Sequence, residues 1–404
     1  MIYFSNTILY LTGAYSLYVT LYLLFINKEL NFINPFFLLL ILFQAYFLLP
    51  AIFIEEIRYY YNWSFSDEDI FFASILTSLL LSVFSAIAYK FKHIKLREYS
   101  TIKISKSIKI IWFLILIYLI YVTYHKFTVG ELFFNTNYKG TEDIYKLKNL
   151  AYLLIPISAL YYISSKKFFI FLPSILIIVL DLLEGSRTTA LLILIPMFLI
   201  FSIVNRKMYI PYILSFIILL SVVGIFRSDN VVQNTPTYLN SMGEFRETYL
   251  PLPIFIGDDD FIGRGDMYTF LSSISFSFLQ PLRNEISKTI VFPGQYSARA
   301  IGRGYGLGAN IIMDSIYYGY LFIFVTIGFV LLISYYFYIT IQKVPMVYSI
   351  IFMSYFFIFL RLSIREGVFY NMSLMAFIMI VYMMPILILN KFSKRIKGYN
   401  DENK

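Results

Sequence analysis

The 404-residue chain contains no cysteine and only two histidines, His93 and His125. The absence of cysteine excludes disulfides, cysteine catalysis, iron–sulfur clusters and zinc sites built on thiolates. Two imidazoles are too few for a metal site that is built on several histidines. The cellular compartment stays open, because a chain without thiols is compatible with either redox environment.

Charged residues are also scarce. They make up 14% of the chain, whereas soluble domains carry about 25%. Hydrophobic residues make up 59% and aromatic residues 20%, and no soluble core of this length can enclose so many apolar side chains. The composition therefore excludes a cytosolic enzyme, a nucleic-acid-binding domain and a disordered chain. The net charge of +9 is better explained by membrane topology than by affinity for nucleic acid.

Long apolar runs follow one another along the chain. A helix needs about 20 apolar residues to cross a bilayer. The runs predict an all-α polytopic membrane protein with about eleven transmembrane helices. We expect them over 3–26, 32–54, 70–89, 110–126, 149–164, 168–184, 188–204, 208–226, 314–340, 345–362 and 368–389.

The charges between these runs predict the orientation. The segment 90–109 and the tail after residue 390 are rich in lysine, and the shorter connections of the same parity are basic too. Basic segments stay in the cytoplasm, so eleven spans place the N-terminus outside and the C-terminus inside. We expect one integral membrane domain over 1–404, with a large outer loop subdomain over 227–313. The apolar stretch Tyr268–Leu282 within that loop predicts an interfacial or re-entrant helix.

The sharpest local pattern is the outer turn that begins at Asp181 and contains Glu184, Gly185 and Arg187. Asp181 and Glu184 are three residues apart and share a helix face. Gly185 permits a tight reversal, and Arg187 opens the next span close to helix N-terminal amides, where an anion can bind. An Arg187–Glu184 ion pair that merely holds two helix ends together explains the pattern equally well.

A second cluster, Arg361, Arg365 and Glu366, ends the tenth predicted span. Arg361 and Arg365 are four residues apart on one helical face, where like charges repel unless an anion such as a diphosphate lies between them. Two arginines that snorkel to lipid phosphates are the more common arrangement at a helix end.

The large outer loop is rich in arginine, whereas the cytoplasmic positive charges are mostly lysines. Guanidinium groups suit bidentate phosphate recognition, although internal ion pairs with the acids of the loop explain the bias as well. The loop arginines are Arg227, Arg246, Arg264, Arg283, Arg299 and Arg303. The run Asp258–Asp260 resembles a metal-binding acidic motif, but such runs are usually solvated turns. The alternating glycines of 302–308 follow no strand, so they do not predict a dinucleotide site.

With these features the chain resembles the bacterial O-antigen and capsule repeat-unit polymerases of the Wzy type. The resemblance rests on the Gly185-Ser186-Arg187 turn between two apolar spans, on the large outer loop late in the chain, and on the passage from Gly306 to Leu321. Family members often show Gly-x-Gly, then an acid, an aromatic residue and a glycine as the next span begins. The acid is commonly Glu, and here it is Asp314. Arg246 and Gly257 also fit an Arg-x10-Gly spacing described for some members.

The resemblance implies a membrane glycosyltransferase of the GT-C type, which acts on the outer face of the bacterial inner membrane. Such enzymes transfer a growing glycan from its undecaprenyl diphosphate carrier to the non-reducing sugar of a fresh lipid-linked unit. They need no metal or other cofactor and usually act with a separate chain-length regulator. We expect Arg187 to bind the diphosphate, followed by Arg361, Arg365, Arg246 and Arg227. The candidates for the base are Glu184, Glu244, Asp314 and Glu366.

Two other membrane functions compete with polymerisation. A flippase for the same lipid-linked oligosaccharide also has many spans and buried arginines, but the long outer loop favours a site outside the bilayer and hence an enzyme. An O-antigen ligase typically relies on a histidine in the large outer loop, and 227–313 contains none. A structural membrane protein without chemistry has little reason to hold so many arginines and carboxylates at one membrane face.

Overall fold

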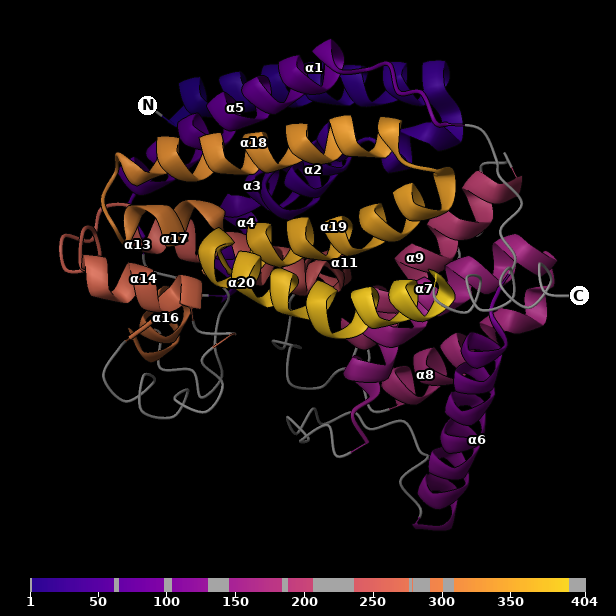
Figure 1. Ribbon diagram of the computed structural model, residues 1–404. Coiled ribbons are helices and arrows are strands. Elements are labelled where there is room, and N and C mark those ends of the chain that lie inside the picture. Colours follow the sequence, from indigo (N-terminus) through magenta and orange to yellow (C-terminus); the bar gives the residue numbers. More distant parts are fainter. Residues whose placement is uncertain are drawn as a thin grey trace, which may run out of the picture. The chain divides into compact units, whose positions relative to one another are not determined.

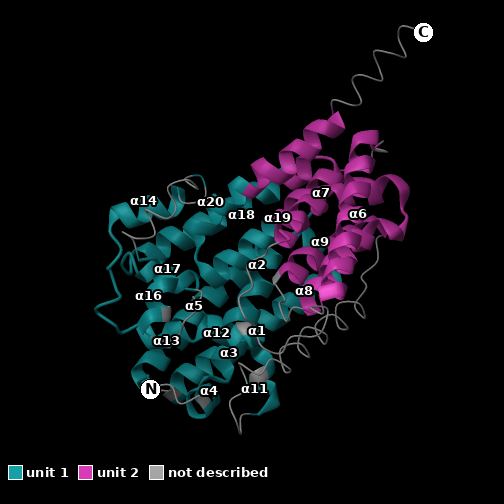
Figure 2. Cartoon of the chain, turned by 90° about the horizontal axis from the view of Figure 1, so that it is seen from below, with its two compact units in different colours: residues 1–95, 232–340, 356–377 teal, residues 96–231, 341–355, 378–404 magenta. Residues whose placement is uncertain are grey.

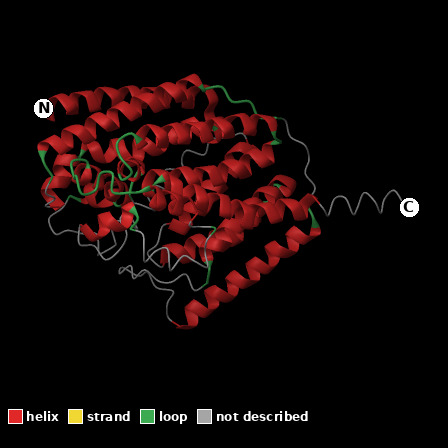
Figure 3. Cartoon of the chain, turned by 60° about the vertical axis from the view of Figure 1, so that its left-hand side comes forward, coloured by secondary structure: helices red, strands yellow, loops and turns green. Residues whose placement is uncertain are grey.

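The computed structural model describes residues 2–61, 65–97, 104–129, 145–183, 188–205, 236–275, 278, 291–300 and 309–391. Helices dominate these ranges and no strand occurs in them, as the predicted all-α class requires (Figure 3). The only strand-like feature among them is a single bridge between Arg97 and Pro345. The described residues group into two compact units (Figure 2).

Unit 1 comprises residues 1–95, 232–340 and 356–377. The described residues of the 227–313 segment fall in unit 1 together with the N-terminal helices, and the expected outer loop subdomain stays a prediction. The helices that begin in unit 1 are labelled in Figure 1, except α12, which is labelled in Figure 2. They are α1 (Ile2–Asn27), α2 (Pro35–Phe43), α3 (Leu49–Ile52), α4 (Ile54–Tyr61), α5 (Asp67–Lys90), α11 (Thr237–Met242), α12 (Glu244–Tyr249), α13 (Pro251–Phe255), α14 (Met267–Ser275), α16 (Pro293–Ala300), α17 (Ile311–Ile316), α18 (Phe322–Lys343) and α20 (Val368–Ile378).

Three short non-α segments interrupt these helices. A 3-10 turn, η1 (Lys28–Ile33), follows α1, and a π-helical segment, η2 (Gln44–Leu48), joins α2 to α3. A second π-helical segment, η6 (Met379–Met383), follows α20. Single π-helical turns inside a longer helix are frequent at functional sites. The side chains of η2 are therefore candidates for a role other than packing.

Unit 2 comprises residues 96–231, 341–355 and 378–404. Its helices are α6 (Lys106–Val129), α7 (Leu147–Ser165), α8 (Leu172–Leu183) and α9 (Thr188–Asn205), with a 3-10 turn, η3 (Phe168–Phe171), before α8. The indole N–H of Trp112 on α6 donates to the carbonyl oxygen of Ile170 at 2.9 Å. Helix α19 (Met346–Glu366) contributes its first half to unit 2 and its second half to unit 1.

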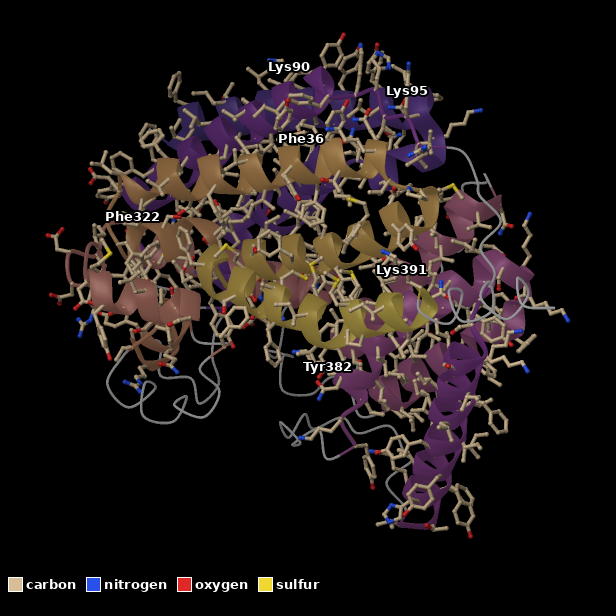
Figure 4. The ribbon with its side chains drawn as sticks, viewed as in Figure 1. Phe36, Lys90, Lys95, Phe322, Tyr382 and Lys391 are labelled. Carbon is tan, nitrogen blue, oxygen red and sulfur yellow. The ribbon has the colours of Figure 1, made fainter. Side chains whose placement is uncertain are left out.

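The start of α5 shows how sequence and structure agree locally. Ser66 accepts a hydrogen bond from the backbone N–H of Asp69 at 3.1 Å, and the Asp69 carboxylate accepts from the Ser66 N–H at 2.8 Å. This reciprocal capping box satisfies N–H groups that the first turn of a helix leaves unpaired. The apolar run that follows then forms a helix of 24 residues, ending at Lys90. Lys90 and Lys95 stay exposed at this end of the helix, in the basic segment whose cytoplasmic position stays a prediction (Figure 4).

Eight helices of the described ranges are long and apolar enough to cross a membrane. They cover Tyr3–Asn27, Pro35–Ile52, Asp67–Lys90, Lys106–Val129, Leu147–Ser165, Phe322–Lys343, Met346–Glu366 and Val368–Lys391. Each overlaps a span expected from the sequence, so the multi-pass character of the chain is confirmed. Two further apolar helices, Phe168–Leu183 and Thr189–Asn205, are shorter, and the expected span 208–226 lies outside the described residues. The count of eleven and the orientation therefore stay predictions.

One expected span begins later than the sequence indicates. The apolar run from 314 predicts a single helix over 314–340, whereas the structure has a short helix, α17, and then a turn before α18 begins at Phe322. Gly319 has a φ of +111° in this turn, a conformation that glycine adopts without a steric penalty. Asp314 consequently lies on α17, outside the spanning helix.

The long helices expose apolar side chains that a soluble protein would bury. Phe4, Leu11 and Phe25 on α1 are exposed, as are Phe113 and Ile120 on α6. Within a bilayer such side chains face lipid tails at no cost. The outward surface of these helices thus agrees with the membrane-spanning assignment.

Candidate functional site

Helix α17 is held in place by Asn310, the residue directly before it. The Asn310 side-chain oxygen accepts hydrogen bonds from the backbone N–H groups of Ile312 at 3.1 Å and Met313 at 3.0 Å. Its amide nitrogen donates to the carbonyl oxygen of Thr248 on α12 at 2.8 Å. One buried side chain therefore caps α17 and fixes it to the short helix that carries Arg246.

Asp314 ties α17 to the turn between α19 and α20. Its carboxylate is buried and accepts a hydrogen bond from the backbone N–H of Val368, the first residue of α20, at 2.9 Å. The preceding residue, Gly367, has a φ of +101°. A Cβ atom added there would lie 2.4 Å from the Asp314 carboxyl carbon. The turn accepts Asp314 only because residue 367 has no side chain.

The surroundings of Asp314 also set its protonation. Burial raises the pKa of the carboxyl from 3.8 to about 7, and the backbone N–H groups of Val368 and Phe369 oppose this by stabilising the anion. Removing a carboxylate from water disfavours its charged form. Asp314 thus exchanges its proton near neutral pH while holding the start of α20, where negative charge is favoured by the helix dipole.

Arg361 is buried in unit 1, with 3% of its surface exposed. Its Nε donates to the hydroxyl of Tyr46 at 3.2 Å. Tyr46 lies on the π-helical segment η2, and its ring contacts that of Phe245 on α12, with 4.9 Å between centroids. Arg361 therefore does not snorkel to lipid headgroups, the alternative that the sequence leaves open for the pair of arginines on α19.

Arg246 lies in the same unit, one residue after Phe245, and is 2% exposed. Its guanidinium donates to the carbonyl oxygen of Leu239 at 3.2 Å and forms an ion pair with Glu247 at 3.0 Å. For Arg246, the internal ion pair that the sequence offers as an alternative to phosphate recognition is present.

Arg365 and Glu366, the last residues of α19, are more accessible. Their side chains form an ion pair at 3.3 Å and are 26% and 34% exposed. Arg365 follows Arg361 by one helical turn, so α19 carries one buried guanidinium and one that solutes can reach. Arg365 and Glu366 come immediately before Gly367, so the turn that Asp314 holds lies next to them.

The remaining predicted residues are not all described. Glu184, Arg187 and Arg227 lie outside the described residues, and so does the side chain of Glu244. In unit 2, three residues before Glu184, the buried Asp181 carboxylate accepts a hydrogen bond from the backbone N–H of Ala190 at 2.8 Å. This bond connects the end of α8 to the first turn of α9. A role for Arg187 at that turn stays a prediction.

The acidic run after α13 forms a turn. Asp258 accepts a hydrogen bond from the backbone N–H of Asp260 at 2.9 Å, the local geometry that makes aspartate common in turns. Throughout the described part of the chain, no three histidine, aspartate or glutamate side chains are grouped so that they could hold a metal ion. The glycine run at 302–308 lies outside the described residues.

Three residues of this neighbourhood escape sequence reasoning: Tyr46, Asn310 and Gly367. Tyr46 lies two residues after Gln44 in an otherwise apolar span, and polar groups within a membrane span often indicate a functional site. Asn310 precedes an apolar run, as an N-cap does. Gly367 follows the last charged residue of α19, where a glycine marks a helix end.

Five of the predicted site residues thus lie in unit 1 and are connected through these three. They are Arg246, Asp314, Arg361, Arg365 and Glu366. The arrangement combines guanidinium groups, which bind phosphate oxygens, with two carboxylates at one helix junction. Comparison with known proteins adds no assignment, since no protein-family model, curated protein or solved structure matches the chain.

Proposed function

We propose that the protein polymerises oligosaccharide repeat units carried on undecaprenyl diphosphate. The observation that carries this proposal is the end of α19, where buried Arg361 and accessible Arg365 lie one turn apart beside the turn held by Asp314. A lipid diphosphate is an anion found at membrane surfaces, and guanidinium groups bind phosphate oxygens through charge-assisted, bidentate hydrogen bonds.

The reaction breaks the bond between the anomeric carbon of the donor glycan and its diphosphate. A hydroxyl of the non-reducing sugar of a fresh lipid-linked unit forms the new glycosidic bond, its proton passes to a base, and undecaprenyl diphosphate leaves. In this scheme Arg365 contacts the diphosphate. Arg361, one turn deeper, adds positive charge in low-dielectric surroundings, where a charge acts over a longer range than in water.

The carboxylates take separate roles in this proposal. A base must come within hydrogen-bond distance of the hydroxyl that it deprotonates. Glu366, with 34% of its side chain exposed, can do so, and Asp314, which is buried against Gly367, acts as a positioning residue for the turn. Glu184 and Glu244 stay alternatives for the base.

The proposal places the protein in a bacterial inner membrane, with its site facing the periplasm or the cell exterior. Its partners there are membrane lipid, the lipid-linked oligosaccharides and a chain-length regulator. The multi-pass character of the chain supports this setting, and the resemblance of the Gly306–Leu321 passage supports the reaction class.

A polysaccharide gel from the parent strain and from a strain without the gene tests the proposal. We expect loss of the long ladder and survival of a band with a single repeat, because export and attachment continue without polymerisation. Loss of every band, with lipid-linked units accumulating inside the cell, would instead identify a flippase. An unchanged ladder would refute any role in this pathway.

Complementation with variants tests the assigned arginines. We expect Arg365→Ala and Arg361→Lys to give shortened or absent ladders at normal protein level, since a lysine cannot make the planar contacts of a guanidinium. Arg299→Ala is the matched control, because Arg299 is an exposed arginine of the same unit at the end of α16. Full ladders from both α19 variants would contradict the assigned roles.

A further inference from the structure

Helix α14 has its polar and apolar sides reversed relative to a helix of a soluble protein. Met267, Tyr268 and Leu271 are 65%, 61% and 56% exposed. Ser272 and Ser273, on the opposite side of the helix, are buried. A surface helix in water keeps its apolar stripe inside and its polar residues outside, so the medium that this helix faces is not water alone.

The buried serines do not need water either. The Ser273 hydroxyl donates to the carbonyl oxygen of Phe270 at 2.7 Å, a bond within the helix. Ser275, which is half-exposed and lies on the side of Leu271, also bonds within the helix, because its hydroxyl donates to the carbonyl oxygen of Leu271 at 2.9 Å. With its proton bonded to the helix backbone, the buried Ser273 hydroxyl is compatible with an apolar environment.

Helix α14 packs against the start of a membrane-spanning helix. The ring of Phe270 contacts those of Phe322, at the start of α18, and Phe369, at the start of α20, with centroids 5.6 Å and 4.7 Å apart. Leu321 and Phe324, beside Phe322, are 78% and 74% exposed. Phe322 marks this end of α18 in Figure 4, and α14 lies beside α17 and α20 in Figures 1 and 2.

The length and the polar start of α14 favour a position at the bilayer surface rather than across the bilayer. Its nine residues extend about 14 Å at 1.5 Å per residue, about half of the hydrocarbon thickness. The exposed Asp266 directly before the helix accepts hydrogen bonds from the N–H and the hydroxyl of Thr269, both at 2.7 Å. Arg264, two residues before Asp266, is also exposed, and its guanidinium lies 4.8 Å from the ring centroid of Tyr296.

We propose that α14 lies in the bilayer surface and inserts Met267, Tyr268 and Leu271 among the acyl chains of the membrane lipid that surrounds the start of α18. The lipid is the occupant because α14 packs against the start of a spanning helix, where Leu321 and Phe324 are also exposed. Asp266 and Arg264 remain at the level of water and headgroups. Helix α14 is then an anchor that holds the 227–313 segment on the membrane, a role beyond the proposed reaction.

The absence of cysteine from the chain makes a direct test available. Single-cysteine variants of the full protein are labelled with an environment-sensitive fluorophore and reconstituted into vesicles of phosphatidylcholine and phosphatidylglycerol. Quenching is measured with iodide, which is confined to water, and with lipids that carry a nitroxide on an acyl chain. Leu271→Cys is the test position and Met267→Cys repeats it, so that a single misfolded variant cannot decide the outcome.

We expect the label at residue 271 to be quenched by the nitroxide lipid and to be several-fold less sensitive to iodide than a label at Asp266→Cys. Phe324→Cys is the control for lipid contact, and Ser273→Cys, on the buried side, is the control for contact with neither quencher. Strong iodide quenching at residue 271 would overturn the proposal, because the stripe would face water. Quenching by neither agent would also overturn it, because protein would then cover the stripe. The test uses no enzymatic activity, so its outcome is independent of the proposed reaction.

Discussion

Replacing Asp314 by asparagine tests the account of the α17–α20 junction. The amide oxygen of asparagine can still accept a hydrogen bond from the N–H of Val368, but the side chain no longer titrates. The folded-state pKa of Asp314 is raised from 3.8 to about 7 by burial, so the folded protein binds this proton more tightly than the unfolded chain does. The wild-type protein therefore loses stability as the pH rises from 3.8 to about 7, while the Asn variant is spared this loss.

The size of the effect follows from the same two values. Below pH 3.8 the carboxyl is neutral in both states and contributes no difference. Above pH 7 it is ionised in both states, and the folded protein bears a cost of about 4 kcal/mol, at 1.36 kcal/mol for each pKa unit. Between about pH 5 and about pH 8, the wild-type protein should lose about 3 kcal/mol of unfolding free energy relative to the variant.

The assay is unfolding of the purified proteins in mild detergent by titration with SDS, followed by circular dichroism at several pH values. The substitution also exchanges an acceptor for an amide donor near the N–H of Phe369, which adds an offset that does not depend on pH. The diagnostic quantity is therefore how the difference in unfolding free energy between the wild-type protein and the variant changes with pH. A difference that stays constant across this range, or a wild-type protein that gains relative to the variant as the pH rises, would refute the reasoning.

Three further substitutions probe the same neighbourhood by SDS titration at fixed pH. Gly367→Ala should cost about 2 kcal/mol or more, because the new methyl meets the Asp314 carboxyl and the positive φ is strained; an unchanged midpoint would contradict this packing. Asn310→Ala should cost about 1–2 kcal/mol through loss of the α17 cap, whereas Asn310→Asp should retain part of it. Tyr46→Phe should cost about 1–3 kcal/mol, because the Nε of buried Arg361 loses its acceptor; a neutral result would show that this bond contributes nothing.

The long helices are the part of the fold that sequence predicts well. Apolar runs such as 67–90 and 106–129 have no other stable arrangement in a bilayer, because every backbone group must be bonded within the segment. The break between α17 and α18 is not predictable in this way. It depends on the local turn at Gly319 and on the hydrogen bond that the N–H of Val368 donates to Asp314, which is a tertiary contact.

The candidate site is predictable only in its charged members. Arginines and carboxylates in apolar surroundings stand out, because burying them is costly. Their partners do not stand out. Tyr46 is separated from Arg361 by 315 positions. It is also one of 37 tyrosines in the chain, so its residue type does not single it out. Whether an arginine at a helix end is buried or snorkels depends on such distant partners.

The most direct test of the central claim is a reaction with the purified protein. The full chain is reconstituted into vesicles and supplied with undecaprenyl diphosphate-linked repeat units of the source polysaccharide. The account predicts glycans of two and more repeats on one lipid carrier, with one undecaprenyl diphosphate released for each new linkage and with the product reduced in the Arg365→Ala variant. Intact single-repeat substrate after incubation, with no free undecaprenyl diphosphate, would contradict it.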